Sequence, residues 1–247
     1  AQTDPGLEVG VEVFDYRYRE RFDGTIVARD RGTFAGLSLR YVETLGSGWS
    51  LSARAEGANA DVDYRSDDGA RIEDVPQSVG RFEILLARDL ALGRSVLTPS
   101  IGIGGRLLED RSGGRIASDG SIGYDRDIFY GYVPIGLSLG LPVGGSRLTT
   151  GVRYAWVTHG TVESRLSQAD AALPDLTLDL NGGRLIEGEA MLAVPVGRRS
   201  IAFGPFARSW STKGSERARV TVPGAVVEFF EPPARTLEAG LRVAFRF

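Results

Sequence analysis

The sequence predicts an all-β protein in which ten antiparallel strands close into an up-and-down transmembrane barrel. Three observations lead to this prediction. Apolar and polar residues alternate with period two in ten segments, as expected for strands with one apolar and one polar face. The connections between these segments alternate between short and long. The composition includes 33 glycines and no cysteine, and so much glycine is atypical of a helical protein.

The overall composition is compatible with a barrel in a membrane. The 247 residues carry a formal net charge of -3, a pI near 5.4 and a mean hydropathy of -0.09. No run approaches the ~18 consecutive apolar residues of a spanning helix. A spanning strand needs only ~9–11 residues and exposes alternate side chains to lipid, so low mean hydropathy is expected. We treat residues 1–247 as a single barrel domain.

The alternation is clearest in residues 237–247, where every odd position is apolar and the even positions are charged or small. The same pattern predicts nine further strands. They span residues 7–18, 33–42, 49–56, 80–86, 97–107, 129–139, 148–156, 186–196 and 201–208. In the first of them the pattern shifts near Phe14, which indicates a β-bulge.

The predicted connections fall into two classes. Short ones lie at residues 44–48, 89–94, 142–146 and 197–199. Long ones, rich in Asp, Arg, Gly and Pro, lie at residues 20–32, 64–77, 109–127, 159–183 and 211–235. Short turns at one end and long loops at the other are typical of transmembrane β-barrels. An even number of strands places both termini at the end with the short turns.

Alternation alone is also compatible with a soluble β-sandwich or a lipocalin-like barrel, because a sandwich hides its apolar faces between two sheets. The aromatic residues favour the membrane barrel. One group is expected near the short turns and comprises Tyr41, Trp49, Phe203, Phe245 and Phe247. A second is expected near the long loops and comprises Phe129, Tyr154 and Trp156. Two aromatic belts around an aliphatic band match the girdles of membrane barrels.

The last strand resembles the C-terminal assembly signal of bacterial outer-membrane β-barrel proteins. The resemblance rests on Leu241, Val243 and Phe245 at alternate positions and on the terminal Phe247. It implies a Gram-negative outer-membrane protein with short periplasmic turns, long extracellular loops and periplasmic termini. The implied partners are outer-membrane lipid, lipopolysaccharide and the barrel assembly machinery. The start, Ala1 to Pro5, would be the mature terminus left after signal-peptide cleavage.

The inward positions of the predicted strands carry an unusual number of charges. They are Glu8, Glu12, Arg40, Arg54, Glu56, Arg81, Glu83, Arg106, Arg153, Glu187, Glu189, Arg208, Glu238, Arg242 and Arg246. Arginine and carboxylate groups can satisfy one another through bidentate pairs, so one interpretation is a network that fills a narrow lumen. The alternative is a charged pore lining that selects small solutes. A wide porin needs ~16–18 strands and is excluded by strand number.

Candidate chemistry is sparse. His159 is the single histidine, which rules out multi-histidine zinc sites, and we expect no metal site and no cofactor. Net negative charge with interleaved Glu argues against nucleic-acid binding. Asp61, Asp63 and His159 resemble part of the omptin protease site, in which two Asp-containing pairs face each other across a groove. The resemblance implies water activation with His159 as general base, but Val157 stands where the orienting Asp is expected.

The fifth long connection is apolar around Pro223 and Gly224, which predicts a hairpin. Three functional hypotheses follow from the sequence. The first is a non-enzymatic barrel that is either structural or a narrow channel. The second is an omptin-like surface hydrolase. The third is an adhesin or receptor that binds its partner through the loops.

Overall fold

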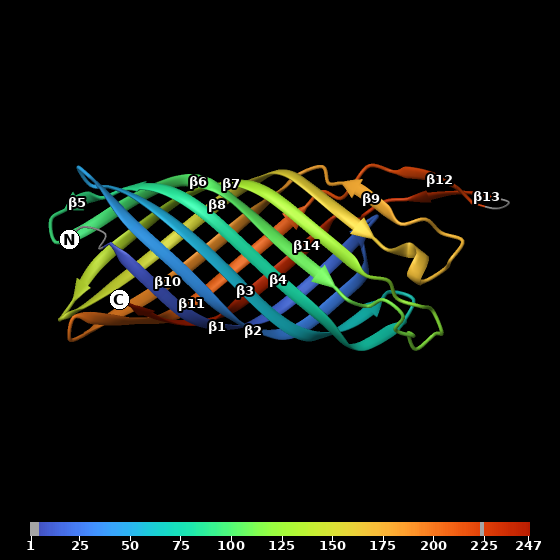
Figure 1. Ribbon diagram of the computed structural model, residues 1–247, viewed down its shortest axis with the longest axis horizontal. Helices are drawn as coiled ribbons and strands as arrows, with labels where there is room; N and C mark the ends of the chain where they lie inside the picture. The colour runs from blue at the N-terminus through green and yellow to red at the C-terminus, as the bar shows by residue number, and fades with distance from the viewer. Residues whose placement is uncertain (1–4, 223–224) are drawn as a thin grey trace.

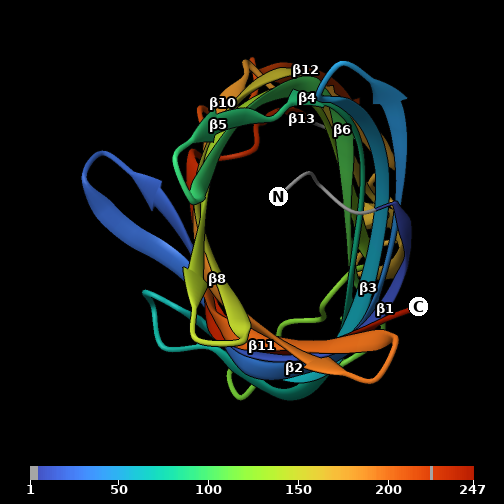
Figure 2. The same cartoon turned by 90° about the vertical axis from the view of Figure 1, so that its left-hand side faces the viewer.

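The computed structural model describes residues 5–222 and 225–247, and its ten long strands close into one antiparallel barrel (Figure 1). These strands are β1 (Gly6–Phe22), β2 (Thr25–Gly46), β3 (Trp49–Ser66), β4 (Arg71–Arg88), β6 (Ser95–Asp110), β7 (Arg126–Val143), β8 (Ser146–Ser164), β10 (Gly183–Val196), β11 (Arg199–Thr212) and β14 (Ala234–Arg246). Strands adjacent in this order pair, and the ring closes where β14 pairs with β1 (Figure 2). The predicted fold class is confirmed.

The remaining elements extend the wall or lie in the connections. They are β5 (Leu90–Leu92), β9 (Leu176–Asp179), β12 (Ala218–Val222), β13 (Ala225–Phe229) and the short 3-10 helix η1 (Leu166–Gln168). Strands β12 and β13 pair with each other, as expected for the apolar hairpin of the fifth connection. Its predicted tip, Pro223 and Gly224, lies outside the described residues. Within the described ranges, no helix has the length and apolar character needed to cross a bilayer.

The barrel has two different ends. The turn end carries the start of β1, the C-terminus and the tight turns (Figure 1). One of these turns is Ser47–Gly48, where φ values of 50° and 79° match the two-residue hairpin turn that follows strand twist. The loop end carries the connections 67–70, 111–125, 165–182 and 213–233.

Two predicted long connections are mostly strand. The β1–β2 turn occupies only residues 23–24, and β3 and β4 are joined by residues 67–70. The sequence prediction of loops at 20–32 and 64–77 was therefore wrong. The prediction failed because the apolar and the polar faces of the strands exchange sides along their length. Toward the loop end, outward positions become charged while inward positions become apolar. Period two persists, but the apolar face changes sides.

The predicted bulge near Phe14 was wrong for the same reason. β1 pairs with β14 and β2 through this point without a shift, and the irregularity lies between Glu20 and Arg21. Phe14, Tyr16 and Tyr18 point inward and are buried, on the same face as Glu12. Strand parity is unchanged, and only the residue types on the two faces exchange.

Candidate functional site

The middle of the lumen is occupied by a set of paired charges, here called the charge layer. Its six arginines and six glutamates are Arg54, Arg81, Arg106, Arg153, Arg208 and Arg242 with Glu12, Glu56, Glu83, Glu187, Glu189 and Glu238. They come from eight of the ten barrel strands and project inward because each lies on the inner parity of its strand. With all twelve groups ionised, the layer carries no net charge.

Many of these ion pairs span the lumen. Arg106 on β6 donates to Glu238 on β14 at 2.9 Å, and these strands stand on opposite sides of the ring. Arg81 on β4 lies 2.7 Å from Glu187 on β10. Because such pairs join distant parts of the wall, they brace the barrel as well as fill it. A buried arginine or carboxylate is tolerated only when partners of this kind satisfy it.

Glu56 and Glu187 are the centres of the charge layer. Glu56 lies 2.8 Å from both Arg81 and Arg242, 3.0 Å from Arg208, and also contacts Arg54. Each carboxylate therefore neutralises part of several guanidinium groups, and each arginine is shared in turn. Removal of one glutamate would leave more than one arginine short of a partner.

An aromatic layer covers the charge layer on its loop-end side. It consists of Phe14, Tyr16, Phe34, Tyr130, Tyr132 and Trp210, all buried. Phe14 stacks on Phe34 with ring centroids 5.3 Å apart. The two layers are joined by cation–π contacts, with Arg106 5.1 Å from the Trp210 ring and 5.9 Å from the Tyr130 ring. Phe206 lies at the level of the charge layer, where Arg208 stands 4.3 Å from its ring.

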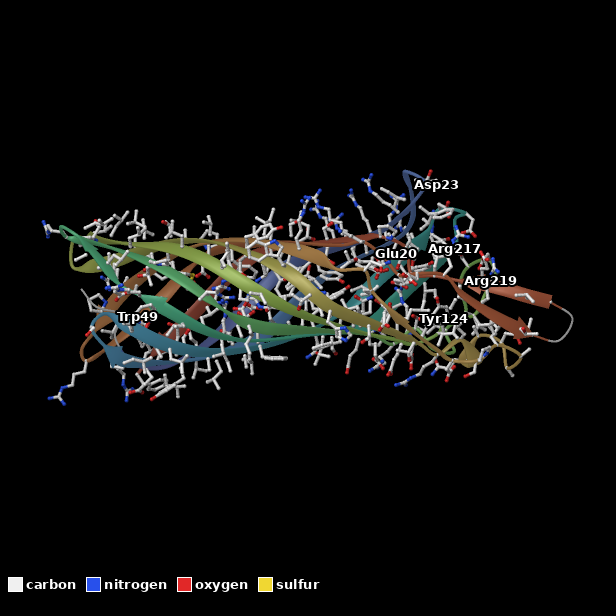
Figure 3. The ribbon with its side chains drawn as sticks, turned by 90° about the horizontal axis from the view of Figure 1, so that it is seen from above. Glu20, Asp23, Trp49, Tyr124, Arg217 and Arg219 are labelled. Carbon is white, nitrogen blue, oxygen red and sulfur yellow. The ribbon has the colours of Figure 1, made fainter. Side chains whose placement is uncertain are left out.

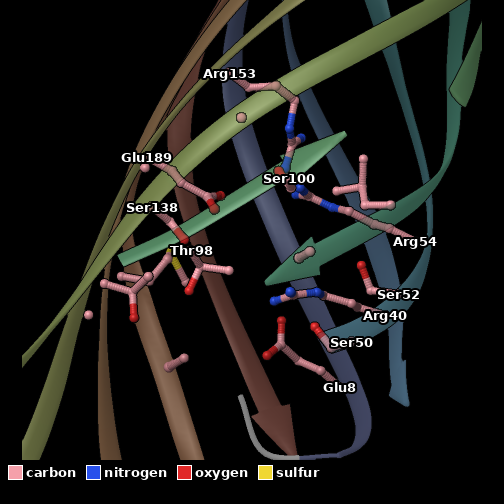
Figure 4. A pocket seen from close by; sticks show the side chains of 18 of the residues that line it. Glu8, Arg40, Ser50, Ser52, Arg54, Thr98, Ser100, Ser138, Arg153 and Glu189 are labelled. Atoms are coloured by element: carbon pink, nitrogen blue, oxygen red, sulfur yellow. The ribbon is translucent and has the colours of Figure 1, made fainter. Parts of the chain in front are cut away.

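On the opposite side, a cavity of about 210 Å³ extends from the charge layer toward the turn end. Figure 4 shows Glu8 and Arg40 among the side chains that point into this turn-end cavity, together with hydroxyls such as Ser50 and Thr98. Arg54 and Arg153 border it where it meets the charge layer. Glu8 is paired with Arg246 at 3.0 Å. Glu8, Arg40 and Arg246, which the sequence predicted to point inward, therefore line the wall of the turn-end cavity and are not part of the charge layer.

A second buried polar group lies beyond the aromatic layer, close to the loop end, and it escaped the sequence analysis. This upper polar cluster comprises Glu20, Asp30, Gln77, Asp110, Arg126 and Glu231. All six members fall in segments that polarity alone marks as loops. The continued inward parity of Tyr16, Tyr18 and Glu20 is the signal that could have revealed it.

Arg126 is the single cation of this cluster and is shared by three carboxylates. It lies 2.6 Å from Glu20, 3.5 Å from Asp110 and 3.6 Å from Glu231. Burial, followed by the charge of nearby Glu20, raises the pKa of Glu231 to about 7. Glu231 belongs to the connection after β13, where its amide donates to the Ser215 hydroxyl at 2.8 Å. The cluster thus attaches this connection to the barrel wall.

No protein-family model matches the sequence, and no curated protein matches it. Several solved structures are similar to this chain. The outer membrane protease OmpT from Escherichia coli superposes with a TM-score of 0.60 at 9% identity, covering 100% of this chain and 98% of that one. Two further structures match with a TM-score of 0.41 each. One is the outer membrane protein OprG from Pseudomonas aeruginosa, at 10% identity, covering 100% of this chain and 99% of that one. The other is the translocator domain of NalP from Neisseria meningitidis, at 11% identity, covering 99% of this chain and 90% of that one. The fold is that of a bacterial outer-membrane β-barrel.

The outer face of the barrel carries a band of exposed aliphatic residues between its two ends. The band includes Val11, Leu37, Ile84, Ile103, Leu137, Val152 and Ile186. From the predicted assembly signal, Leu241, Val243 and Phe247 are exposed on this face, and the Phe245 ring packs against Phe247 at 4.9 Å. So much exposed apolar surface is expected where lipid rather than water surrounds the wall.

The structure does not bring together the three residues that resemble the omptin site. Asp61 and Asp63 flank the buried Val62 on β3, so both point away from the lumen. His159 is exposed on β8, opposite Gly131 of β7. In the ring, β4, β6 and β7 separate β3 from β8, and outward-facing side chains cannot meet across the lumen. This correction follows from strand parity. Among the described residues, no cluster of acidic or histidine side chains is placed to hold a metal ion.

Proposed function

We propose that the chain is a non-conducting outer-membrane barrel that carries a rigid platform at its loop end. The observation that supports this most is the filling of successive levels of the lumen. Arg106, Glu187 and Glu238 in the charge layer, and Phe14 and Trp210 in the aromatic layer, are almost completely buried. Since an ion has to displace desolvated, mutually paired groups to pass, the barrier to permeation is high.

The proposal includes an orientation. The turn end lies in the periplasm and the loop end lies outside the cell, as in barrels with short periplasmic turns and long extracellular loops. The chain is inserted by the assembly machinery through its last strand. Protease accessibility of the loop end on intact cells tests this orientation, and cleavage only after the outer membrane is permeabilised would contradict it.

The platform is the part of the barrel that extends beyond the apolar band. Its outer face is charged, and its interior holds aromatic residues and the upper polar cluster. The β12–β13 hairpin projects farther still (Figure 1), stabilised by ion pairs of Glu228 with Arg217 and Arg219, both at 2.9 Å. A closed, internally braced support of this kind suits presentation of loops to a surface partner, the role of an adhesin or receptor.

Planar bilayer recording tests the non-conducting state. The wild-type protein, shown to be folded by its heat-modifiable gel migration, is expected to give no discrete current steps. A triple variant, Arg106→Ala with Glu238→Ala and Trp210→Ala, removes one cross-lumen pair and its aromatic cover and is expected to conduct. Regular steps from the wild type would overturn the proposal and favour the narrow-channel alternative.

A further inference from the structure

Five exposed arginines lie side by side across five consecutive strands at the loop end. They are Arg235 on β14, Arg19 on β1, Arg29 on β2, Arg65 on β3 and Arg71 on β4. The strand register places each directly opposite the next. At the usual strand spacing of about 4.8 Å, this Arg row spans roughly 19 Å. All five side chains belong to the outward parity of their strands.

Such a row is unfavourable by itself, because like charges directly opposite each other destabilise a sheet. In the part of the chain that the structure describes, no carboxylate oxygen lies within 4.0 Å of the guanidinium groups of Arg19, Arg29, Arg65 or Arg71. The nearby Asp15 is engaged by Arg17 at 2.6 Å and Arg31 at 3.7 Å. The chain pairs its buried arginines thoroughly, whereas in the described residues the arginines of this row form no ion pair with a carboxylate.

The position of the Arg row indicates where its counter-charge comes from. Leu237, an exposed apolar residue, follows Arg235 by two positions on β14. On β1, Val13 is the last exposed apolar residue before Arg19. The row therefore begins at the edge of the apolar band and rises obliquely away from it. The β1–β2 hairpin, whose tip carries Asp23 (Figure 3), leans out beyond the outline of the barrel (Figure 2).

We propose that the Arg row binds the phosphate groups of a phosphorylated glycolipid of the lipopolysaccharide type in the outer leaflet. The inference rests on the proposed orientation, with the loop end outside. Guanidinium groups bind phosphate through paired, charge-assisted hydrogen bonds. A ligand anchored in the membrane presents phosphate at the lower end of the row and further acidic groups above it. Binding offsets the repulsion between the arginines and couples the platform to the membrane surface.

A matched pair of double variants tests the proposal. Arg29→Gln with Arg65→Gln removes two charges from the middle of the row. Arg217→Gln with Arg219→Gln removes two exposed charges from the β12–β13 hairpin (Figure 3), where both arginines are paired with Glu228. Each protein, in non-ionic detergent, is titrated with purified lipopolysaccharide, with dephosphorylated lipopolysaccharide and with inorganic phosphate. Because all four positions are exposed, both variants are expected to fold.

The row variant is expected to bind lipopolysaccharide at least about tenfold more weakly, and the hairpin variant should bind as the wild type does. Dephosphorylated lipopolysaccharide should bind the wild type as weakly as lipopolysaccharide binds the row variant. Equal losses in both variants, or equal affinity for inorganic phosphate, would overturn the proposal. In detergent the result depends neither on orientation nor on the lumen, so failure of the orientation or of the closed lumen is detected separately by surface proteolysis and bilayer recording.

Discussion

Replacing Glu187, one of the two centres of the charge layer, by alanine should strongly destabilise the barrel. The Glu187 side chain is only 2% exposed. Its carboxylate lies 2.7 Å from Arg81, 3.2 Å from Arg153, 3.6 Å from Arg208 and 3.8 Å from Arg54. The variant leaves an uncompensated positive charge in a desolvated lumen, and loss of one partner of a buried ion pair costs about 3–5 kcal/mol.

Glu189→Ala is the matched control, because Glu189 lies two residues away on the same face of β10. Its side chain is 25% exposed and makes one ion pair within 4.0 Å, to Arg242 at 3.3 Å. It borders the turn-end cavity, where water can replace the carboxylate, so the expected cost is about 1 kcal/mol or less. Both are measured by guanidinium unfolding in lipid vesicles, monitored by tryptophan fluorescence. Equal losses of unfolding free energy would refute the reasoning that buried pairing, rather than charge count, stabilises the barrel.

Three further predictions use the same unfolding assay. Leu241→Arg, at a position 64% exposed on the apolar band, should cost about 2–4 kcal/mol at mid-bilayer, and an unchanged midpoint would show that this face does not contact lipid. Gly102→Ala should cost about 1–3 kcal/mol, because the new Cβ would lie 1.9 Å from the Ile84 carbonyl oxygen, whereas Gly57→Ala meets nothing within 4 Å and should be tolerated. Glu231, whose pKa is raised to about 7, holds its proton more tightly in the folded protein; its contribution to stability is therefore present at acidic pH and lost as pH rises through about 7. Glu231→Gln should remove that dependence, and identical profiles would contradict it.

Much of the wall could be predicted from sequence because period two is a local property of an extended chain. Glu12, Arg81, Glu187 and Arg242 were assigned to the inner face from parity alone, without knowledge of any partner. The same reasoning failed at Phe14, where the pattern reverses. A residue's parity is set by strand geometry, but whether its face is apolar depends on what surrounds the barrel at that height. The level of a residue along the barrel axis cannot be read from the local alternation of apolar and polar residues.

Pairing was decided only by the tertiary structure. Arg106 and Glu238 are 132 residues apart, and their contact depends on the closure of the ring and on the stagger accumulated over all strands between them. The Arg row likewise exists only through register, since a shift of one residue in any strand would turn an arginine inward. Sequence by itself determined which side chains alternate between two environments. The closed sheet determined which of them meet, because hydrogen-bond register is a collective property of neighbouring strands.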